Sequence, residues 1–182
     1  MNFIAGVDEV GRGCLAGPVT AAAVILKNPI PGLNDSKQIS SSKREALSRI
    51  IIEESIFSFA NISNYKIDEI NIHQATLLAM QEAIIGLPIT PDLVYVDGKF
   101  TPDVEVNCKA VVGGDKLIPE ISAASIIAKV HRDEFMIELD KKFPIYAFAQ
   151  NKGYGTAHHL NALKESGYSR FHRKTFKGVI AE

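Results

Sequence analysis

Four acidic residues stand where apolar, strand-like segments end, and each has a glycine close by. They are Asp8, Glu9, Asp97 and Asp115. Ligands of α/β sheets usually bind at strand ends. If these ends meet on one edge, four ionised carboxylates cannot share the space unless a cation offsets their repulsion. Oxygen ligands of this kind select Mg²⁺ or Mn²⁺, so the sequence predicts a divalent metal site.

Each acid also has a plainer interpretation as a turn residue, because Asp and Gly dominate turns. Asp8 and Glu9 fit that interpretation less well, since two adjacent acids that close an apolar strand gain nothing from the core. Neighbouring strand residues point to opposite faces. Both acids can therefore reach one site only at a twisted or frayed strand end.

The segment from Gly11 to Ala16 formally fits the Gly-x-Gly-x-x-Ala dinucleotide fingerprint. That motif must open a helix whose N-terminus binds pyrophosphate. Here Pro18 and the β-rich segment 19–26 follow, and the acids just before Gly11 would repel a pyrophosphate. The pattern therefore favours a tight turn between two strands.

The elements that must position these residues mix strands and helices. Strands are predicted at 3–10, 19–26, 56–62, 93–96 and 104–112. Helices are predicted from the capping box Ser42-x-x-Glu45 to Glu54, at 70–85, at 121–139, and from a Thr156 cap to about Glu165, with an irregular loop at 143–155. This mixture indicates an α/β fold in which helices pack on the faces of one sheet.

Length and charge add an outline of the molecule. With 182 residues, 46% of them hydrophobic, the chain is expected to form a single domain over 1–182. Residues 141–182 carry eight Lys and Arg against two acids, a net charge of +6, whereas the preceding residues carry −7. This basic C-terminal segment either holds a polyanion beside the carboxylates or is a solvated surface.

Several other chemistries are excluded. Cys14 and Cys108 offer neither a disulfide framework nor a zinc motif, and we interpret both as inert thiols. The adjacent His158 and His159 would face different ways on a helix, a poor chelating arrangement. The chain has no secretion signal and no apolar run near the ~20 residues of a membrane span. We expect a cytoplasmic protein that does not bind membranes.

Seven blocks of the sequence stand out as motifs: Gly6-Val7-Asp8-Glu9-Val10-Gly11-Arg12-Gly13, Ala16-Gly17-Pro18-Val19, Asp35-Ser36-Lys37, Val96-Asp97-Gly98, Gly113-Gly114-Asp115, the helix from Ser122 to Asp133, and Lys152-Gly153-Tyr154-Gly155-Thr156. In sequence and in order, these blocks resemble those of type 2 ribonucleases H, the ribonuclease HII family. The resemblance covers about residues 3–176, nearly the whole chain.

The resemblance implies a ribonuclease H-like mixed sheet with helices on its faces. It implies hydrolysis of the RNA strand in RNA–DNA hybrids and cutting on the 5′ side of ribonucleotides embedded in duplex DNA, with 5′-phosphate and 3′-hydroxyl products. It also implies a catalytic site of two divalent metals, Mg²⁺ or Mn²⁺, bound by Asp8, Glu9, Asp97 and Asp115. Whether all four acids contact metal directly stays open.

By the same resemblance, backbone groups of Gly11, Arg12 and Gly13 read the 2′-hydroxyl, and the Tyr154 ring packs on the adjoining deoxyribose. A 2′-hydroxyl is the group that distinguishes RNA from DNA at a given position. Arg12 and Lys37 suit phosphate contacts, which position a substrate without specifying its sequence. Without the motif, Tyr154 would be interpreted as a packed aromatic residue with a bonded hydroxyl.

Basic residues elsewhere are less certain substrate contacts. Lys129 and Arg132, on the predicted long helix, are either phosphate contacts or solvated charges. The family often reads Arg-Arg-x-Ser-Phe near its end, whereas this chain reads His172-Arg173-Lys174-Thr175-Phe176. That departure leaves open what the first position contacts.

Three functional hypotheses follow. The first is a metal-dependent endoribonuclease, expected to be a monomer, that acts on nucleic acid in DNA replication and ribonucleotide excision repair. The second is another two-metal nuclease or phosphohydrolase that ignores the 2′-hydroxyl. The third is a nucleic-acid-binding module whose acids are structural turns.

Overall fold

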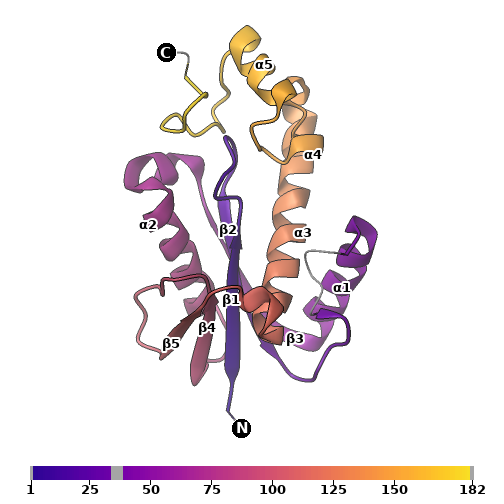
Figure 1. Cartoon of the computed structure of the whole chain (residues 1–182), viewed down its shortest axis with the longest axis vertical. Helices are drawn as coiled ribbons and strands as arrows, with labels where there is room; N and C mark the ends of the chain where they lie inside the picture. The colour runs from indigo at the N-terminus through magenta and orange to yellow at the C-terminus, as the bar shows by residue number, and fades with distance from the viewer. Residues whose placement is uncertain (1, 34–38, 181–182) are drawn as a thin grey trace.

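The computed structural model describes residues 2–33 and 39–180, and its core is a five-stranded mixed sheet (Figure 1). The strands are β1 (Ile4–Val10), β2 (Val19–Leu26), β3 (Ser55–Ile62), β4 (Leu93–Asp97) and β5 (Cys108–Val111), in the spatial order β3-β2-β1-β4-β5. β2 pairs antiparallel with β1 and β3, whereas β1, β4 and β5 run parallel. The predicted mixed sheet is confirmed.

Helices cover both faces of this sheet. They are α1 (Ser41–Glu54), α2 (Asn64–Ile85), α3 (Pro119–Lys142), α4 (Phe148–Asn151) and α5 (Ala157–Ser166), with 3-10 turns η2 (Gly114–Lys116) and η3 (Pro144–Tyr146). α2 packs on one face, and α1 and α3 pack on the other (Figure 1). In the part of the chain described, no helix combines the length and the apolar character that a membrane span requires.

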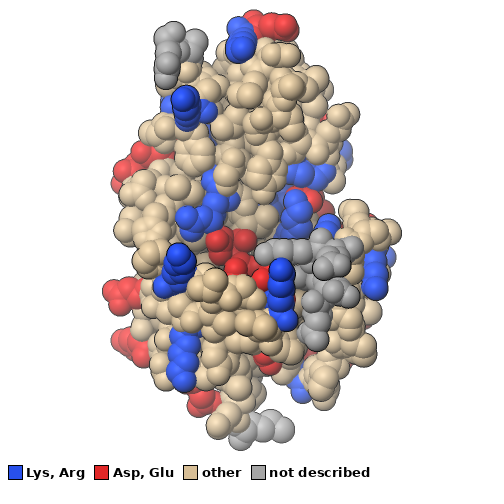
Figure 2. All heavy atoms as spheres, viewed as in Figure 1, with Lys and Arg blue, Asp and Glu red and all other residues tan. Residues whose placement is uncertain are grey.

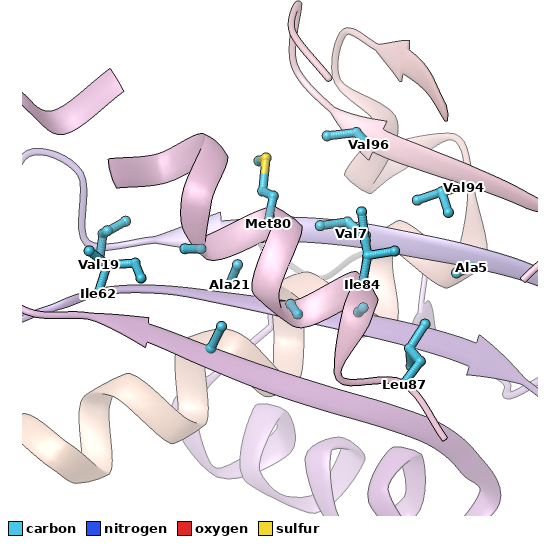
Figure 3. Close-up of a cluster of buried hydrophobic side chains, with 14 of the residues drawn as sticks. Ala5, Val7, Val19, Ala21, Ile62, Met80, Ile84, Leu87, Val94 and Val96 are labelled. Carbon is cyan, nitrogen blue, oxygen red and sulfur yellow. The ribbon is translucent and has the colours of Figure 1, made fainter. Parts of the chain in front are cut away.

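Seven of the eight residues of β2 are apolar, Thr20 being the exception, as suits a strand whose two faces are both buried. Ala21, Ala23 and Ile25 belong to the cluster under α2, where strand side chains meet Met80 and Ile84 (Figure 3). The alternate residues of β2 pack instead with α1 and α3. The strand therefore lies at the centre of two cores and fixes β1 beside it.

The helix α3 lies unusually close to β1. A Cβ on Gly6 would stand 2.1 Å from the Glu120 carbonyl carbon and 2.2 Å from the Ile121 nitrogen, so only glycine fits there. Ala123 and Ala124 are fully buried on the same helix. This close packing brings the first turns of α3 next to the end of β1.

A third apolar cluster joins the far end of α3 to the C-terminal segment and to the turn between β1 and β2. Its members include Leu15, Met136, Phe148, Leu163 and Val179. Figure 1 shows α4, α5 and the last residues gathered beyond that turn. The basic segment 141–182 is thus packed against the glycine-rich turn through its apolar side chains.

One predicted strand was too long. The strand predicted at 104–112 is only Cys108–Val111, because β4 offers ladder partners from Val94 to Asp97 alone. Val104 and Val106 pack half-buried against the core from irregular chain. These valines are apolar because they pack against the core, and they are not paired in the sheet.

Helix starts were also partly wrong. α2 begins at Asn64 and not near residue 70, because Ser63 caps it by accepting the Lys66 N–H. Asn71, with φ 68°, interrupts this helix, and its side-chain oxygen accepts the His73 and Gln74 N–H groups as a second cap. The prediction had found only the part after this kink.

Of the two helix caps predicted from sequence, one is wrong and one is confirmed. α1 is capped by Ser40, whose Oγ accepts the Lys43 N–H, and not by Ser42. The Thr156 cap of α5 is confirmed, since its hydroxyl accepts the His159 N–H. The loop predicted at 143–155 contains η3 and α4, so it is more ordered than expected.

Candidate active site

The parallel pairing of β1, β4 and β5 brings their carboxyl ends to one edge of the sheet. The β1–β4 ladder ends at the pair Val7 and Val96, so Asp8 and Asp97 follow at neighbouring positions. β5 ends at Val111, after which the chain turns through Gly113 into η2. The predicted meeting of the acid-bearing strand ends is therefore what the fold produces.

Three of the four predicted acids line one hollow of about 360 Å³. Its wall consists of Asp8, Glu9, Val10, Arg44, Asp97, Ser125, Ile126 and Lys129. Figure 2 shows acidic atoms in the middle of this face with Lys and Arg side chains around them. An acidic floor with a basic rim suits a phosphodiester held beside bound cations.

The fourth acid, Asp115, is 1% exposed and does not line this hollow. Its neighbour Gly114 packs against β4, where an added Cβ would stand 3.4 Å from Asp97 Oδ1. Asp115 is thus placed next to the hollow through the backbone of η2. Its direct participation in metal binding stays a prediction.

Asp8 and Glu9 reach the same hollow although they are neighbours in a strand. β1 is paired with β4 only as far as Val7, so the next residues have a ladder on one side only. The Glu9 N–H donates to Asp8 Oδ1 over 2.8 Å. The strand end supplies the geometry that two adjacent acids need.

These carboxylates are held against an electrostatic cost. Burial raises the pKa of Asp8 well above its usual value, the charges of Glu9 and Asp97 raise it further, and the Ser125 hydroxyl lowers it. Burial also raises the pKa of Glu9. The Arg12 guanidinium, 3.9 Å from Glu9 Oε1, lowers this pKa, and the charge of Asp97 raises it. Both shifts disfavour the ionised forms of Asp8 and Glu9, and a bound cation would offset this cost.

The side chains fit a divalent cation. Within residues 2–33 and 39–180, Glu9 Oε2 and Asp97 Oδ1 are buried and accept no hydrogen bond. Buried carboxylate oxygens without partners are costly, and a hard cation satisfies them. As they stand, no group of three or more His, Cys, Asp and Glu side chains among these described residues is arranged to hold a metal ion.

The described residues among those predicted to bind substrate lie in the turn after β1 and at Tyr154, close to that turn. Gly11, Arg12 and Gly13 follow β1 directly, and the Arg12 side chain is 45% exposed. A Cβ on Gly13 would be 4.0 Å from Tyr154 Cε1, so the turn and the half-exposed Tyr154 ring face each other. Lys37 lies outside the described residues.

Arg132, which the sequence left between a phosphate contact and a solvated charge, is neither, because it is fully buried. Lys129 lines the hollow, and its Nζ donates to Asp133 Oδ1 over 2.8 Å. Arg44 and Ser125 line the hollow as well but were not predicted. Helical spacing can place Ser125 on α3, yet it cannot show that α3 turns this residue toward Asp8.

The segment near the C-terminus is fastened to Tyr154 by two buried histidines. The Ser169 N–H donates to His172 Nδ1, so the neutral His172 ring carries its proton on Nε2. That group donates to His159 Nε2 over 2.9 Å, and His159 Nδ1 then donates to the Tyr154 carbonyl. His172 therefore holds the Tyr154 loop and is no surface contact for phosphate.

Both cysteines are free thiols, and their inertness stays a prediction. Cys14 is fully buried and its Sγ lies 3.5 Å from the Lys152 carbonyl oxygen. Cys108 is half-buried in β5, and burial raises the pKa of its thiol. A raised pKa keeps the Cys108 thiol from ionising readily, and the thiolate is the nucleophilic form of cysteine.

The fold and the acid-bearing strand ends define a ribonuclease H-like α/β protein. The ribonuclease H2 of Pyrococcus horikoshii OT3 superposes with a TM-score of 0.84 at 25% identity, covering 97% of this chain and 95% of that one. The ribonuclease HII of Archaeoglobus fulgidus, in a complex with PCNA, superposes with a TM-score of 0.83 at 27% identity, covering 96% of this chain and 95% of that one.

The sequence itself is closer to bacterial relatives. The family model for ribonuclease HII matches residues 5–179. The ribonuclease HII of Borrelia hermsii is 53% identical over 181 residues, which cover 97% of this chain and 100% of the relative. The ribonuclease HII of Vibrio parahaemolyticus is also 53% identical, over 98% of this chain and 86% of the relative. The chain belongs to the ribonuclease HII family. It is an endoribonuclease with metal-dependent ribonuclease H activity on nucleic acid.

We predict that Asp97→Asn raises the melting temperature of the metal-free protein. The change removes a charge that destabilises the ionised forms of Asp8 and Glu9. Relief of about 1 kcal/mol corresponds to a rise of roughly 2–4 °C for a chain of this size. Thermal melts in chelator at pH 8 measure it. The control Asp103→Asn removes an exposed carboxylate outside the hollow, and an equal rise in both variants would contradict the prediction.

We also predict that acid weakens the histidine contact. Burial and the neighbouring His159 lower the pKa of His172 to about 4. Because this folded-state pKa lies below the unfolded value, the contribution is complete above pH 6.5 and is lost as the pH falls toward 4. Relative to His172→Gln, the protein should lose about 2 kcal/mol between pH 7.5 and pH 5. Urea unfolding of both proteins at the two pH values tests this, and parallel pH profiles would refute it.

Proposed function

We propose that this protein hydrolyses the RNA strand of RNA–DNA hybrids and cuts on the 5′ side of ribonucleotides embedded in duplex DNA, leaving 5′-phosphate and 3′-hydroxyl ends. The observation that carries the proposal is the position of an acidic hollow beside the turn that faces Tyr154. Such an arrangement would place a scissile phosphate and the 2′-hydroxyl next to it within reach of one chain.

In this proposal, Asp8, Glu9, Asp97 and Asp115 hold two divalent ions, Mg²⁺ or Mn²⁺. When bound, such ions supply a hydroxide for attack and neutralise charge on the leaving 3′ oxygen. The fit of the acids rests on the buried Glu9 and Asp97 oxygens that lack hydrogen bonds among the described residues. Arg12, 3.9 Å from Glu9 Oε1, would hold Glu9 in place until the cation arrives.

The choice of ribonucleotide is assigned to the turn after β1. Arg12 and Gly13 are exposed, and none of the hydrogen bonds among the described residues uses their backbone N–H groups. Two such donors beside the acids could bind a 2′-hydroxyl oxygen, which a deoxyribonucleotide lacks. The Tyr154 ring would then pack on the adjoining deoxyribose, and Lys37 and the exposed Arg12 side chain would contact phosphates.

The same proposal treats residues 1–182 as one catalytic domain that works as a cytoplasmic monomer. Removal of embedded ribonucleotides is chemistry that serves DNA replication and ribonucleotide excision repair. The basic segment 141–182, which carries Tyr154, would contribute to holding the duplex.

Cleavage of an end-labelled DNA duplex with one ribonucleotide, in Mg²⁺ or Mn²⁺, tests the proposal. We expect a single cut on the 5′ side of the ribonucleotide, no cut in an all-DNA duplex, and no activity in chelator. Asp97→Asn should lower the rate at least about a thousandfold, since a metal ion supplies several kcal/mol of stabilisation. The exposed-site variant Asp103→Asn should retain it.

Other outcomes would favour the alternatives. Equal cutting of both duplexes would indicate a nuclease that ignores the 2′-hydroxyl. Binding that survives chelation and Asp97→Asn, without any cutting, would indicate a nucleic-acid-binding module.

A further inference from the structure

Two arginines beside the active site are fully buried, and their guanidinium groups donate hydrogen bonds to main-chain carbonyls. Arg132 on α3 and Arg173 near the C-terminus are both 0% exposed. Neither forms an ion pair within 4.0 Å among the residues described. A buried guanidinium is tolerated only when its N–H groups are hydrogen-bonded. What these groups bind therefore indicates why they are there.

Arg173 binds the turn that we assign to the 2′-hydroxyl. Its Nη2 donates to the Gly11 carbonyl over 2.7 Å and its Nη1 to the Arg12 carbonyl over 2.8 Å. Its Nε and Nη2 also donate to the Gly17 carbonyl, over 3.1 and 3.0 Å. One guanidinium thus spans both ends of the turn.

Arg132 fastens the far limb of the same turn. Its Nε donates to the Pro18 carbonyl over 2.9 Å and its Nη2 to the Ala16 carbonyl over 3.1 Å. Its Nη1 donates to the Lys152 carbonyl over 2.9 Å. None of these acceptors belongs to the peptide units that carry the Arg12 and Gly13 N–H groups.

The contacts of Arg173 orient those two N–H groups. In a trans peptide the C=O and the N–H of one unit point in opposite directions. A guanidinium on the Gly11 and Arg12 carbonyls therefore turns the Arg12 and Gly13 N–H groups away from the protein interior. A cationic donor on the carbonyl also polarises each peptide unit, which strengthens its N–H as a donor.

Both N–H groups lie where a ligand could use them. Arg12 and Gly13 are exposed, and the Tyr154 ring faces Gly13.

Burial lowers the pKa of Arg173 to about 10, which still leaves it protonated at neutral pH. The charge is therefore available under physiological conditions.

We propose that Arg173 is the positioning residue for ribonucleotide selection: it fixes and polarises the peptide units 11–12 and 12–13, whose N–H groups bind the 2′-hydroxyl. The Arg132 side chain packs against Gly11, where an added Cβ would stand 2.1 Å from its Nε, but its hydrogen bonds go to other carbonyls. It therefore supports the turn without orienting these two N–H groups. The inference rests on the proposed function, since it assumes that the turn reads the sugar. In this proposal Arg173, which follows His172 near the C-terminus, acts inside the protein and does not contact the phosphates.

Arg173→Lys and Arg132→Lys form a matched pair, because each keeps the charge of a fully buried arginine but loses the fork geometry. The measurement is the ratio of Kd values for an all-DNA duplex and for the same duplex with one ribonucleotide, in Ca²⁺ to slow cleavage. The kcat and KM for the ribonucleotide duplex in Mg²⁺ are measured beside it. Melting temperatures report the structural cost of each change.

We expect both variants to lose stability, while the preference falls about 10- to 100-fold in Arg173→Lys and stays within about threefold of the wild-type value in Arg132→Lys. Equal loss of preference in both variants, or none in Arg173→Lys, would overturn the role of Arg173 alone. A wild-type protein without preference for the ribonucleotide would overturn this role together with the proposed function.

A measurement on the unsubstituted protein applies even if neither variant folds. NMR of isotopically labelled protein should show scalar coupling across the hydrogen bonds from the Arg173 guanidinium to the Gly11 and Arg12 carbonyls. The Arg12 and Gly13 amide resonances should shift on adding the ribonucleotide duplex and much less on adding the all-DNA duplex. Absence of the coupling, or equal shifts with both duplexes, would contradict the inference.

Discussion

Repulsion between carboxylates at the end of three parallel strands is the constraint on which the rest of the structure depends. The register of β1 and β4 places Asp97 beside Asp8, and Glu9 shares their hollow. Burial and mutual repulsion oppose ionisation of the first strand's acids. The fold must offset that cost elsewhere, and the tight packing of α3 on Gly6 shows how rigidly the strand is held. Holding these acids together costs stability while no cation is bound.

A second constraint operates one turn further along the chain. In the proposed function, the residues after β1 offer backbone donors to the 2′-hydroxyl, and pairing of β1 in the sheet ends before them, at Val10. The fold holds this turn through Arg173 and Arg132, through the Leu15 contacts with Gly153 and Arg173, and through the third apolar cluster. The buried arginines thus hold a turn that has no strand partner. In the proposed function, the acids and the turn that selects the ribonucleotide are then adjacent in the chain.

Much of this was predictable because local patterns decided it. The bounds of β2 and the acids at the strand ends follow from apolar runs and glycine. What failed depended on partners distant in sequence. The length of β5 is set by β4, and the fate of Arg132 is set by the carbonyls of a turn more than a hundred residues away. Charge predicts exposure on average, so a guanidinium that is buried on backbone oxygens leaves no trace in composition. The clustering of Asp8 and Glu9, although foreseen, required a strand end whose geometry only the ladders define.

The central claim, that these acids are held together for a cation, is tested most directly by metal binding. Mn²⁺ is titrated into the wild-type protein, Asp97→Asn and the exposed-site control Asp103→Asn at pH 8, and free Mn²⁺ is followed by electron paramagnetic resonance. Our account predicts that Asp97→Asn weakens binding at least about tenfold, because one carboxylate ligand is worth more than about 1.4 kcal/mol, while Asp103→Asn binds like the wild type. Equal affinity in all three proteins would show that the hollow at the strand ends is not the metal site.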